Sequence, residues 1–283
     1  MSLSLNRLYA ALGISKQAFH QRLERRARQC SYEHQLLYLL YELRQEHPTM
    51  GLRDMYYILR PECMGRDAFE AFCRRIGLSS ARTYNYRRTT DSSGVIRFAN
   101  LTLQLQLVRI NQLWVSDITY FELQGSFYYL TFILDAYSRR ILGYSVSARL
   151  FTEQTTLAAL KMAVKTRKGM DLRGTIFHSD GGGQYYDKAF LKETQRLGLL
   201  NSMCEYPWEN GKAERINGII KNNYLRHRSI SDFSGLIKEV DRSVQLYNEK
   251  KPHIKLKRVS PLTFEKSIFA STNNTSLNNN PYR

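Results

Sequence analysis

The order of strands and helices after residue 112 restricts the chain to few folds. Three β-prone runs, at residues 113–123, 127–135 and 141–147, follow one another with short turns between them. Short turns join antiparallel neighbours, because parallel neighbours need a crossover of a dozen or more residues. Helices and strands then alternate, with elements predicted at 152–168, 175–178, 187–197, 199–202, 210–226 and 231–249. This order predicts a mixed α/β sheet and disfavours a Rossmann-type sheet, whose strands are joined through helices.

Basic residues gather at both ends of the chain. The sequence has 42 Lys and Arg against 25 Asp and Glu, a net charge of +17. Residues 1–90 hold 15 basic and 8 acidic side chains, residues 206–283 hold 14 and 7, and residues 111–205 hold 11 and 9. Two basic ends around a near-neutral middle indicate a polyanion bound on both sides of a central domain. On charge alone, a generally basic protein without such a partner is the alternative.

Composition excludes several other classes of protein. An apolar content of 43% is too high for a largely disordered chain. No apolar run approaches the roughly 20 residues of a membrane span, and residues 1–9 lack the apolar core of a signal peptide. The cysteines show no C-x-x-C spacing and no histidine pair has zinc-finger spacing, so a zinc module is not predicted. We expect a cytoplasmic, nucleoid-associated protein with reduced thiols and no membrane partner.

Three carboxylates lie in distinctive local sequences. Asp117 lies within L-W-V-S-D-I-T-Y-F, Asp180 ends F-H-S-D before three glycines, and Glu214 ends W-E-N-G-K-A-E at the start of a helix. Each alone has an ordinary explanation, as a turn, a cap or a solvated side chain. Brought together by folding, they would suit a two-metal phosphoryl-transfer site, because Mg²⁺ prefers carboxylate oxygen and leaves positions open for water and phosphate. Without a cation, the gathered carboxylates would raise one another's pKa values.

The residues around these carboxylates resemble those of the DDE transposases and integrases, most closely the OrfB-type transposases of bacterial insertion sequences. The matching motifs are W-V-S-D-I-T-Y, L-D-A-Y-S-R-R-I-L-G-Y, H-S-D-G-G-G-Q-Y and W-E-N-G-K-A-E, within a resemblance over roughly residues 5–265. The resemblance implies an RNase H-like core, with a mixed five-stranded sheet and helices on both faces. It also implies that Asp117, Asp180 and Glu214 are catalytic and bind two Mg²⁺ ions, with Mn²⁺ as a substitute.

One spacing departs from the family pattern. Here 33 residues separate Asp180 from Glu214, two fewer than is usual in the family. The interval from Trp208 to Glu214 keeps the family's length, so the missing residues fall in the loop 203–207. We therefore expect an intact active-site helix that follows a shortened loop.

The first part of the chain is predicted to bind DNA through helices. Residues 1–30 are predicted to form a helix-turn-helix, with Gly13 ending the first helix and Ser15 capping the second. In such a unit the second helix enters the major groove. Its candidate base contacts are Gln17, His20 and Gln21, and its candidate phosphate contacts are Lys16, Arg22, Arg25 and Arg26. A helical hairpin without DNA contacts is the alternative.

The remaining segments differ in composition. Residues 31–78 are predicted to form a second helical unit, with one helix over 33–46. Residues 79–111 read as a basic and aromatic linker in which Arg87 is a candidate DNA contact, or as a plain solvated linker. The catalytic core is predicted over 112–268, and residues 269–283 are too polar to fold alone, so a disordered tail is predicted.

Helical spacing adds candidates beside Glu214. Residues three, four and seven positions further on share its face, and these are Asn217, Gly218 and Lys221. Lys221 is a candidate contact for a DNA phosphate, as are Lys212 and Arg215 on the same helix.

Several further side chains have predicted places in the core or in caps. Asn210 is expected to cap the helix of Glu214, and Asp135 to pair with Arg139 or Arg140. His178 lies either near the reacting bond or in a buried, hydrogen-bonded position. Trp114, Trp208 and the run 127–129 are expected in the core.

The function implied by the resemblance is DNA transposition. A transposase of this kind would cut a strand at the end of its mobile element and transfer the resulting 3′-OH to another phosphodiester. Its implied partners are the terminal repeats and target DNA, further copies of the chain on DNA, and an upstream-frame helix-turn-helix protein or a frameshift fusion with it. The alternatives are a non-catalytic DNA-binding regulator, disfavoured because carboxylates facing DNA would not help it bind, and a metal-dependent nuclease that does not join strands.

Overall fold

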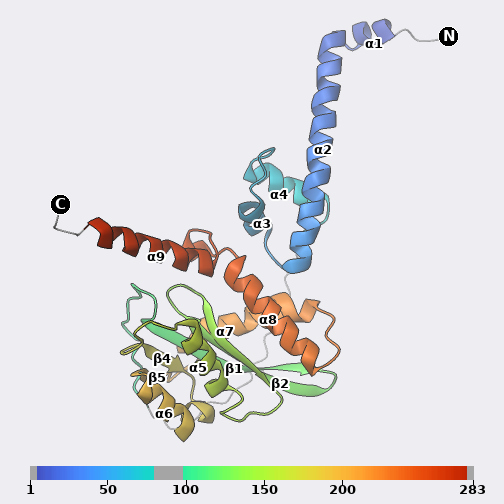
Figure 1. The fold of residues 1–283 in the computed structure, drawn as a ribbon. Helices are drawn as coiled ribbons and strands as arrows, with labels where there is room; N and C mark the ends of the chain where they lie inside the picture. The colour runs from blue at the N-terminus through green and yellow to red at the C-terminus, as the bar shows by residue number, and fades with distance from the viewer. Residues whose placement is uncertain (1–4, 80–97, 279–283) are drawn as a thin grey trace. The chain divides into compact units, whose positions relative to one another are not determined.

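The structure, a computed structural model, describes residues 5–79 and 98–278, and the chain divides into two compact units, residues 1–80 and 81–283 (Figure 1). Arg87, a candidate DNA contact, lies outside the described residues, as does most of the predicted linker. Within the described parts, no helix has both the length and the apolar character of a membrane span.

The first unit is made of four helices. They are α1 Leu5–Ala11, α2 Lys16–Glu46, α3 Leu52–Leu59 and α4 Arg66–Arg75. Ser15 caps α2 as predicted, since its Oγ accepts the Ala18 N–H at 3.1 Å, and Gly13 before it has a positive φ of 63°. The C-terminal half of α2 packs on α3 and α4 through a core that includes Leu40, Met55 and Phe69.

Helix α2 does not break near residue 30, where the sequence had suggested a boundary between two helical units. It continues for 31 residues. The physical reason is that residues 16–46 contain neither Gly nor Pro, so nothing in the backbone interrupts the hydrogen-bond ladder. Residues 16, 17 and 20–32 of this helix are exposed, so the candidate contacts Lys16, Gln17, Arg22 and Arg25 all lie in solvent.

The second unit contains the predicted five-stranded mixed sheet. Its strands are β1 Leu113–Leu123, β2 Ser126–Asp135, β3 Ile141–Ser147, β4 Ile176–Ser179 and β5 Leu200–Met203, in the order β3-β2-β1-β4-β5. The first three pair antiparallel, whereas β4 pairs parallel with both β1 and β5. This is the RNase H-like topology, and it confirms that the first and fourth strands are neighbours.

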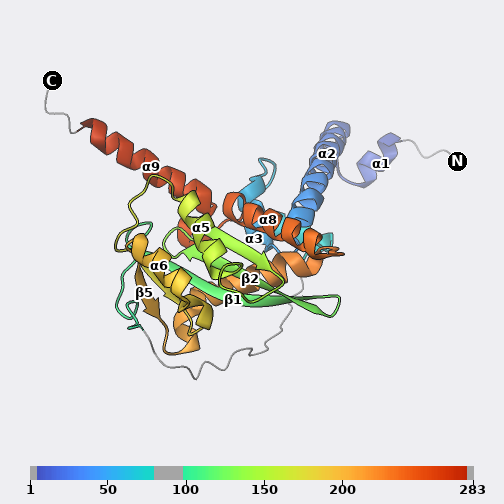
Figure 2. The same ribbon diagram turned by 60° about the horizontal axis from the view of Figure 1, so that its bottom comes forward.

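Helices cover both faces of this sheet (Figures 1 and 2). Helices α5 Thr156–Thr166 and α6 Lys188–Arg196 cover one face, and α7 Gly211–Gly218 and α8 Phe233–Glu249 cover the other. Because side chains alternate along a strand, Trp114 of β1 enters the α5 core while Leu113 and Val115 enter the α7 core. Helix α7 continues through a π-helical segment, Ile219–Tyr224, a distortion that is frequent at functional sites.

The last helix, α9 Pro261–Asn278, extends into the segment predicted to be disordered from residue 269. Once the helix has formed at its apolar start, each further residue adds a hydrogen bond without a new nucleation cost, so polar residues can continue it. Glu265 in its first half is buried and holds the helix to the core. Its carboxylate accepts from Arg140 Nη1 and Arg167 Nη1, each at 2.7 Å.

The same buried network corrects the partner predicted for Asp135. Its side chain accepts the N–H groups of Asn111 and Ser138 at 2.7 and 2.9 Å, and its ion-pair partner is Arg167 at 3.4 Å. Neither Arg139 nor Arg140 pairs with it; Arg140 pairs with Glu265 instead. Arg167 directly follows the last residue of α5 and lies 32 positions from Asp135 in the sequence, so only folding brings Arg167 and Asp135 together.

Replacing Arg167 with Met should destabilise the second unit strongly. Two buried carboxylates, Asp135 and Glu265, would lose their shared cation, and removing one partner of a buried ion pair costs about 3–5 kcal/mol. Urea unfolding followed by circular dichroism measures the loss. The matched control is Arg173→Met, because Arg173 pairs with Asp171 on the surface and its loss should cause no resolvable change. Equal effects of the two substitutions would contradict the role given to the buried network.

Candidate active site

The parallel pairing of β1 with β4 places two candidate carboxylates side by side. Val115 is paired with His178, and the same register continued by two residues sets Asp117 opposite Asp180. Both carboxylates then lie on the sheet face that α7 covers, because side chains two positions apart on a strand share a face. Helix α7 carries Glu214 in its first turn.

The negative charges of these side chains interact strongly. Burial, followed by the charges of Asp180 and Glu214, raises the pKa of Asp117 to about 8. Burial also raises the pKa of Asp180, although the N–H of Gly182, 3.2 Å from its Oδ1, favours the ionised form. A carboxylate held among like charges in a partly dry site binds a proton or another cation with unusual strength.

Glu214 differs from the two aspartates in exposure. It is exposed on α7, whereas Asp117 and Asp180 are half-buried. Over residues 5–79 and 98–278, no three His, Cys, Asp or Glu side chains converge closely enough to enclose one metal ion. The fold therefore brings the aspartates together and Glu214 into electrostatic range of Asp117, with the glutamate side chain open to solvent.

Two of the three helix neighbours predicted for Glu214 contact β1. Asn217 Nδ2 donates to Asp117 Oδ2 at 2.8 Å, which fixes the orientation of that carboxylate. Lys221 Nζ donates to Thr119 Oγ1 at 2.6 Å and lies 5.5 Å from the centre of the Tyr120 ring. A Cβ added at Gly218 would meet only Asn222 Nδ2, at 3.9 Å, so the backbone is not tightly covered there.

Asn210 has a different role from the predicted cap. It makes no side-chain cap of α7; instead its Nδ2 donates to the backbone carbonyl of Ser116 at 2.8 Å. Asn210 is buried. The start of the active-site helix is therefore tied to the residue that precedes Asp117.

A buried tyrosine beneath the aspartates was not found by sequence reasoning. Tyr185 is almost fully buried, and its hydroxyl lies 2.9 Å from Ser116 Oγ. Its pKa is raised well above the usual value, first by burial and then by the charges of Asp180 and Asp117. The only signal in the sequence was its place in H-S-D-G-G-G-Q-Y, five positions after Asp180.

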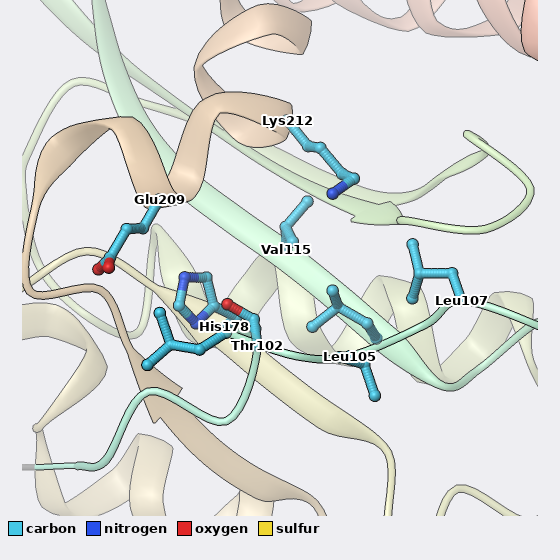
Figure 3. Close-up of a pocket in the computed structure, with 9 residues that line it drawn as sticks. Thr102, Leu105, Leu107, Val115, His178, Glu209 and Lys212 are labelled. Carbon is cyan, nitrogen blue, oxygen red and sulfur yellow. The ribbon is translucent and has the colours of Figure 1, made fainter.

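His178 is buried and hydrogen-bonded, which is one of the two positions that the sequence predicted for it. Its Nδ1 is 2.9 Å from Ser202 Oγ, and burial lowers its pKa to about 4. It lines a cavity of about 230 Å³ together with leucines of the segment before β1, Glu209 and Lys212 (Figure 3). A histidine with this pKa is neutral at physiological pH.

Lys212, which is partly buried, lies close to other cations. Burial, followed by the charges of Arg139 and Lys255, lowers its pKa, and Arg215 lies close enough to Arg139 to lower the pKa of that side chain. In the part of the chain that the structure describes, none of these four side chains has an ion-pair partner.

The aromatic residues divide between core and surface. Trp114 is fully buried as predicted, but Trp208 is 71% exposed, so its predicted place in the core is wrong. Phe127 is also exposed, because it lies at the free end of the β1–β2 hairpin. Trp208 lies in a 3₁₀-helical turn, Pro207–Asn210, between β5 and α7.

Comparisons with known proteins identify the family. An integrase core domain family matches residues 108–206, and a second family of that description matches residues 200–261. The chain is 29% identical over 238 residues to the transposase for insertion sequence element IS629 of Shigella sonnei, covering 82% of this chain and 79% of that protein. It is 30% identical over 233 residues to a putative transposase for insertion sequence element IS986/IS6110 of Mycobacterium tuberculosis, covering 78% and 82%.

Among solved structures, the catalytic core domain of HTLV-2 integrase in complex with magnesium matches with a TM-score of 0.43 and 19% identity, over 54% of this chain and 95% of that one. The fold and site geometry described above agree with the sequence relationship. The chain belongs to the DDE-type insertion-sequence transposases, the polynucleotidyl transferases of transposition that carry an integrase core domain.

Proposed function

We propose that Asp117, Asp180 and Glu214 are the catalytic residues of this transposase and that they hold two Mg²⁺ ions, for which Mn²⁺ can substitute. The observation that carries the proposal is the parallel pairing of β1 with β4, which brings the two partly buried aspartates together. Burial, followed by the charges of Asp180 and Glu214, raises the pKa of Asp117 to about 8. A donor set of carboxylate oxygens fits Mg²⁺, and a divalent cation would remove the repulsion. Glu214 is exposed and able to turn toward the aspartates when a cation and DNA are present.

The reaction supported by this site is cleavage of a DNA strand at the end of a mobile element, followed by strand transfer. Water would attack the phosphorus and release a 3′-OH, and that hydroxyl would then attack a second phosphodiester. Bound divalent ions supply charge stabilisation of the attacking and leaving oxygens. The protein's part is positioning: Asn217 orients Asp117, the Gly182 N–H orients Asp180, and Tyr185 closes the site from below.

Two surfaces are proposed to contact the DNA backbone. One is the exposed half of α2, with Lys16, Arg22 and Arg25, beside Gln17 as a base contact. The other is the group of unpaired cations around Lys212 next to the active-site helix, with Lys221 at the site itself. Cations left without carboxylate partners bind phosphate without first breaking an ion pair.

Assembly with other chains is part of the same proposal. Element ends and target DNA must be held together, which several copies of the chain on DNA would achieve. The sequence has no sustained heptad repeat for a coiled coil, so an upstream-frame helix-turn-helix partner, or a frameshift fusion with it, is proposed to assist. Work on DNA in this way suits a cytoplasmic, nucleoid-associated protein.

Replacing Asp117 with Asn should abolish strand joining while leaving DNA binding intact. Loss of a direct metal ligand should lower the joining rate by more than the roughly 10- to 100-fold typical of residues that only support a ligand. The assay follows a labelled duplex carrying the element's end, with Mg²⁺, Mn²⁺ or EDTA. Asp171→Asn is the control, because Asp171 is an exposed carboxylate paired with Arg173. Joining by Asp117→Asn at the parent rate would refute the site assignment, and cleavage without joining by the parent would favour the nuclease.

The same substitution should stabilise the metal-free protein at high pH. The folded-state pKa of Asp117, about 8, lies above the value of about 3.9 for an unfolded Asp, so its stabilising contribution is complete below pH 4 and is lost as pH rises toward 8. At pH 8 the melting temperature of Asp117→Asn should therefore be higher than that of the parent, by about 2–4 °C for each kcal/mol that removal of the charge contributes. At pH 4 the two melting temperatures should be equal.

Differential scanning calorimetry in EDTA measures this difference. Asp171→Asn is again the control, since Arg173 lowers the pKa of Asp171 to about 2 and its loss should not stabilise the protein at either pH. Added Mg²⁺ should raise the melting temperature of the parent and close the gap to Asp117→Asn. A difference in melting temperature between parent and Asp117→Asn that is the same at both pH values would contradict a raised pKa at Asp117.

A further inference from the structure

A pair of exposed, stacked aromatic rings lies in the loop between β5 and α7. The centres of Tyr206 and Trp208 are 4.6 Å apart and their planes differ by 5°. Tyr206 covers one face of the indole, yet Trp208 is 71% exposed, so its other face is open to solvent. Among the described residues no other ring lies against Trp208. The result is a flat aromatic surface with one free face.

This loop is held in place from both ends. At its start the N–H of Cys204 donates to the Ser179 carbonyl at 3.0 Å, and at its end Asn210 Nδ2 donates to the Ser116 carbonyl at 2.8 Å. Ser179 and Ser116 are the residues immediately before Asp180 and Asp117. The ring pair is therefore positioned by the same two strands that carry the aspartates.

A third contact orders the middle of the loop. Glu209 Oε2 accepts the N–H groups of Glu205 and Tyr206 at 2.7 and 3.1 Å, which closes the backbone into a tight turn. Only Glu205 to Glu209 lie between the two anchoring residues, consistent with the shortened loop in the sequence. A rigid aromatic surface loses little conformational freedom when a ligand binds to it.

The chemistry of this surface fits an unpaired nucleobase. Every base has a flat π face, and stacking on an aromatic side chain is favourable whatever the base. Lys212, four positions after Trp208 in the sequence, is a partly buried cation that lines the cavity beside His178 and Glu209. A protein partner would need about 800 Å² of complementary surface, far more than two rings offer.

We propose that the Tyr206–Trp208 pair stacks on an unpaired base of the DNA strand that enters the active site, and so fixes that strand relative to Asp117 and Asp180. This inference rests on the proposed function, because it takes DNA as the substrate. Unstacking a base from a duplex costs a few kcal/mol, so a surface that receives the base favours an opened strand end over a fully paired one. Trp208 is thus a binding residue that contacts substrate.

Intrinsic fluorescence offers a direct test, because the chain has only two tryptophans and Trp114 is fully buried. The probe is a short single-stranded oligodeoxynucleotide, added in EDTA so that no strand is cut. Stacking should quench the Trp208 emission, and a fully paired hairpin duplex should quench it much less. The signal should be absent in Trp208→Phe, which keeps a ring but not the indole.

Affinities measured by fluorescence anisotropy of labelled DNA complete the test. Trp208→Leu should weaken single-strand binding about 5- to 150-fold, the range for loss of one stacked base, whereas Trp208→Phe should retain most of the affinity. The matched control is Phe127→Leu, which removes another exposed ring of the same unit and should leave the affinity for single strands unchanged. Thermal melts should show all three variants folded, since both rings are exposed.

Equal binding of single strands by Trp208→Leu and the parent would overturn the proposal, as would equal quenching by paired and single-stranded probes. Quenching that depends on protein concentration without DNA would also overturn it, because a second copy of the chain would then cover the rings. Asp117→Asn should keep the full quench. Failure of the catalytic assignment would appear as strand joining by Asp117→Asn, and failure of the stacking surface as unchanged single-strand binding by Trp208→Leu, so the two outcomes are distinguishable.

Discussion

Parallel pairing between β1 and β4 is the constraint on which the rest of the site depends. The pairing sets Asp117 and Asp180 on one face of the sheet, where burial and the charges of Asp180 and Glu214 oppose ionisation of Asp117. Other elements of the site contact these two strands or the aspartates that they carry. Asn217 orients the first aspartate, Gly182 the second, and the loop before α7 is anchored to the residue preceding each.

The acidic side chains inside the second unit differ in whether a basic side chain neutralises them. Asp135 and Glu265 share Arg167, so their charges are balanced and they serve to hold the β2–β3 turn and α9 to the core. Asp117 and Asp180 form no ion pair with Lys or Arg in the described parts of the chain. A half-buried pair of carboxylates is costly unless a cation from solution neutralises it, which is the electrostatic argument for metal-dependent chemistry.

Sequence patterns predicted the sheet well, because strand alternation and hairpin turns are local signals. The pairing of Asp135 with Arg167 and the bond from Asn210 to Ser116 were missed, since both join residues remote in the chain. Helix α2 was divided wrongly, because residues 1–30 were assigned to one helical unit and 31–78 to another, whereas the helix is continuous from Lys16 to Glu46. Trp208 was placed in the core on residue type alone, whereas it lies exposed in the 3₁₀-helical turn before α7.

The proposed chemistry requires Asp117, Asp180 and Glu214 to bind divalent cations together. The most direct test is a crystal structure of the full chain grown with Mn²⁺, with anomalous scattering used to locate the ion. The account predicts Mn²⁺ between the carboxylates of Asp117 and Asp180, with the side chain of Glu214 turned toward them when DNA is bound. Crystals without Mn²⁺ at these residues, or with the ion bound by other side chains, would contradict it.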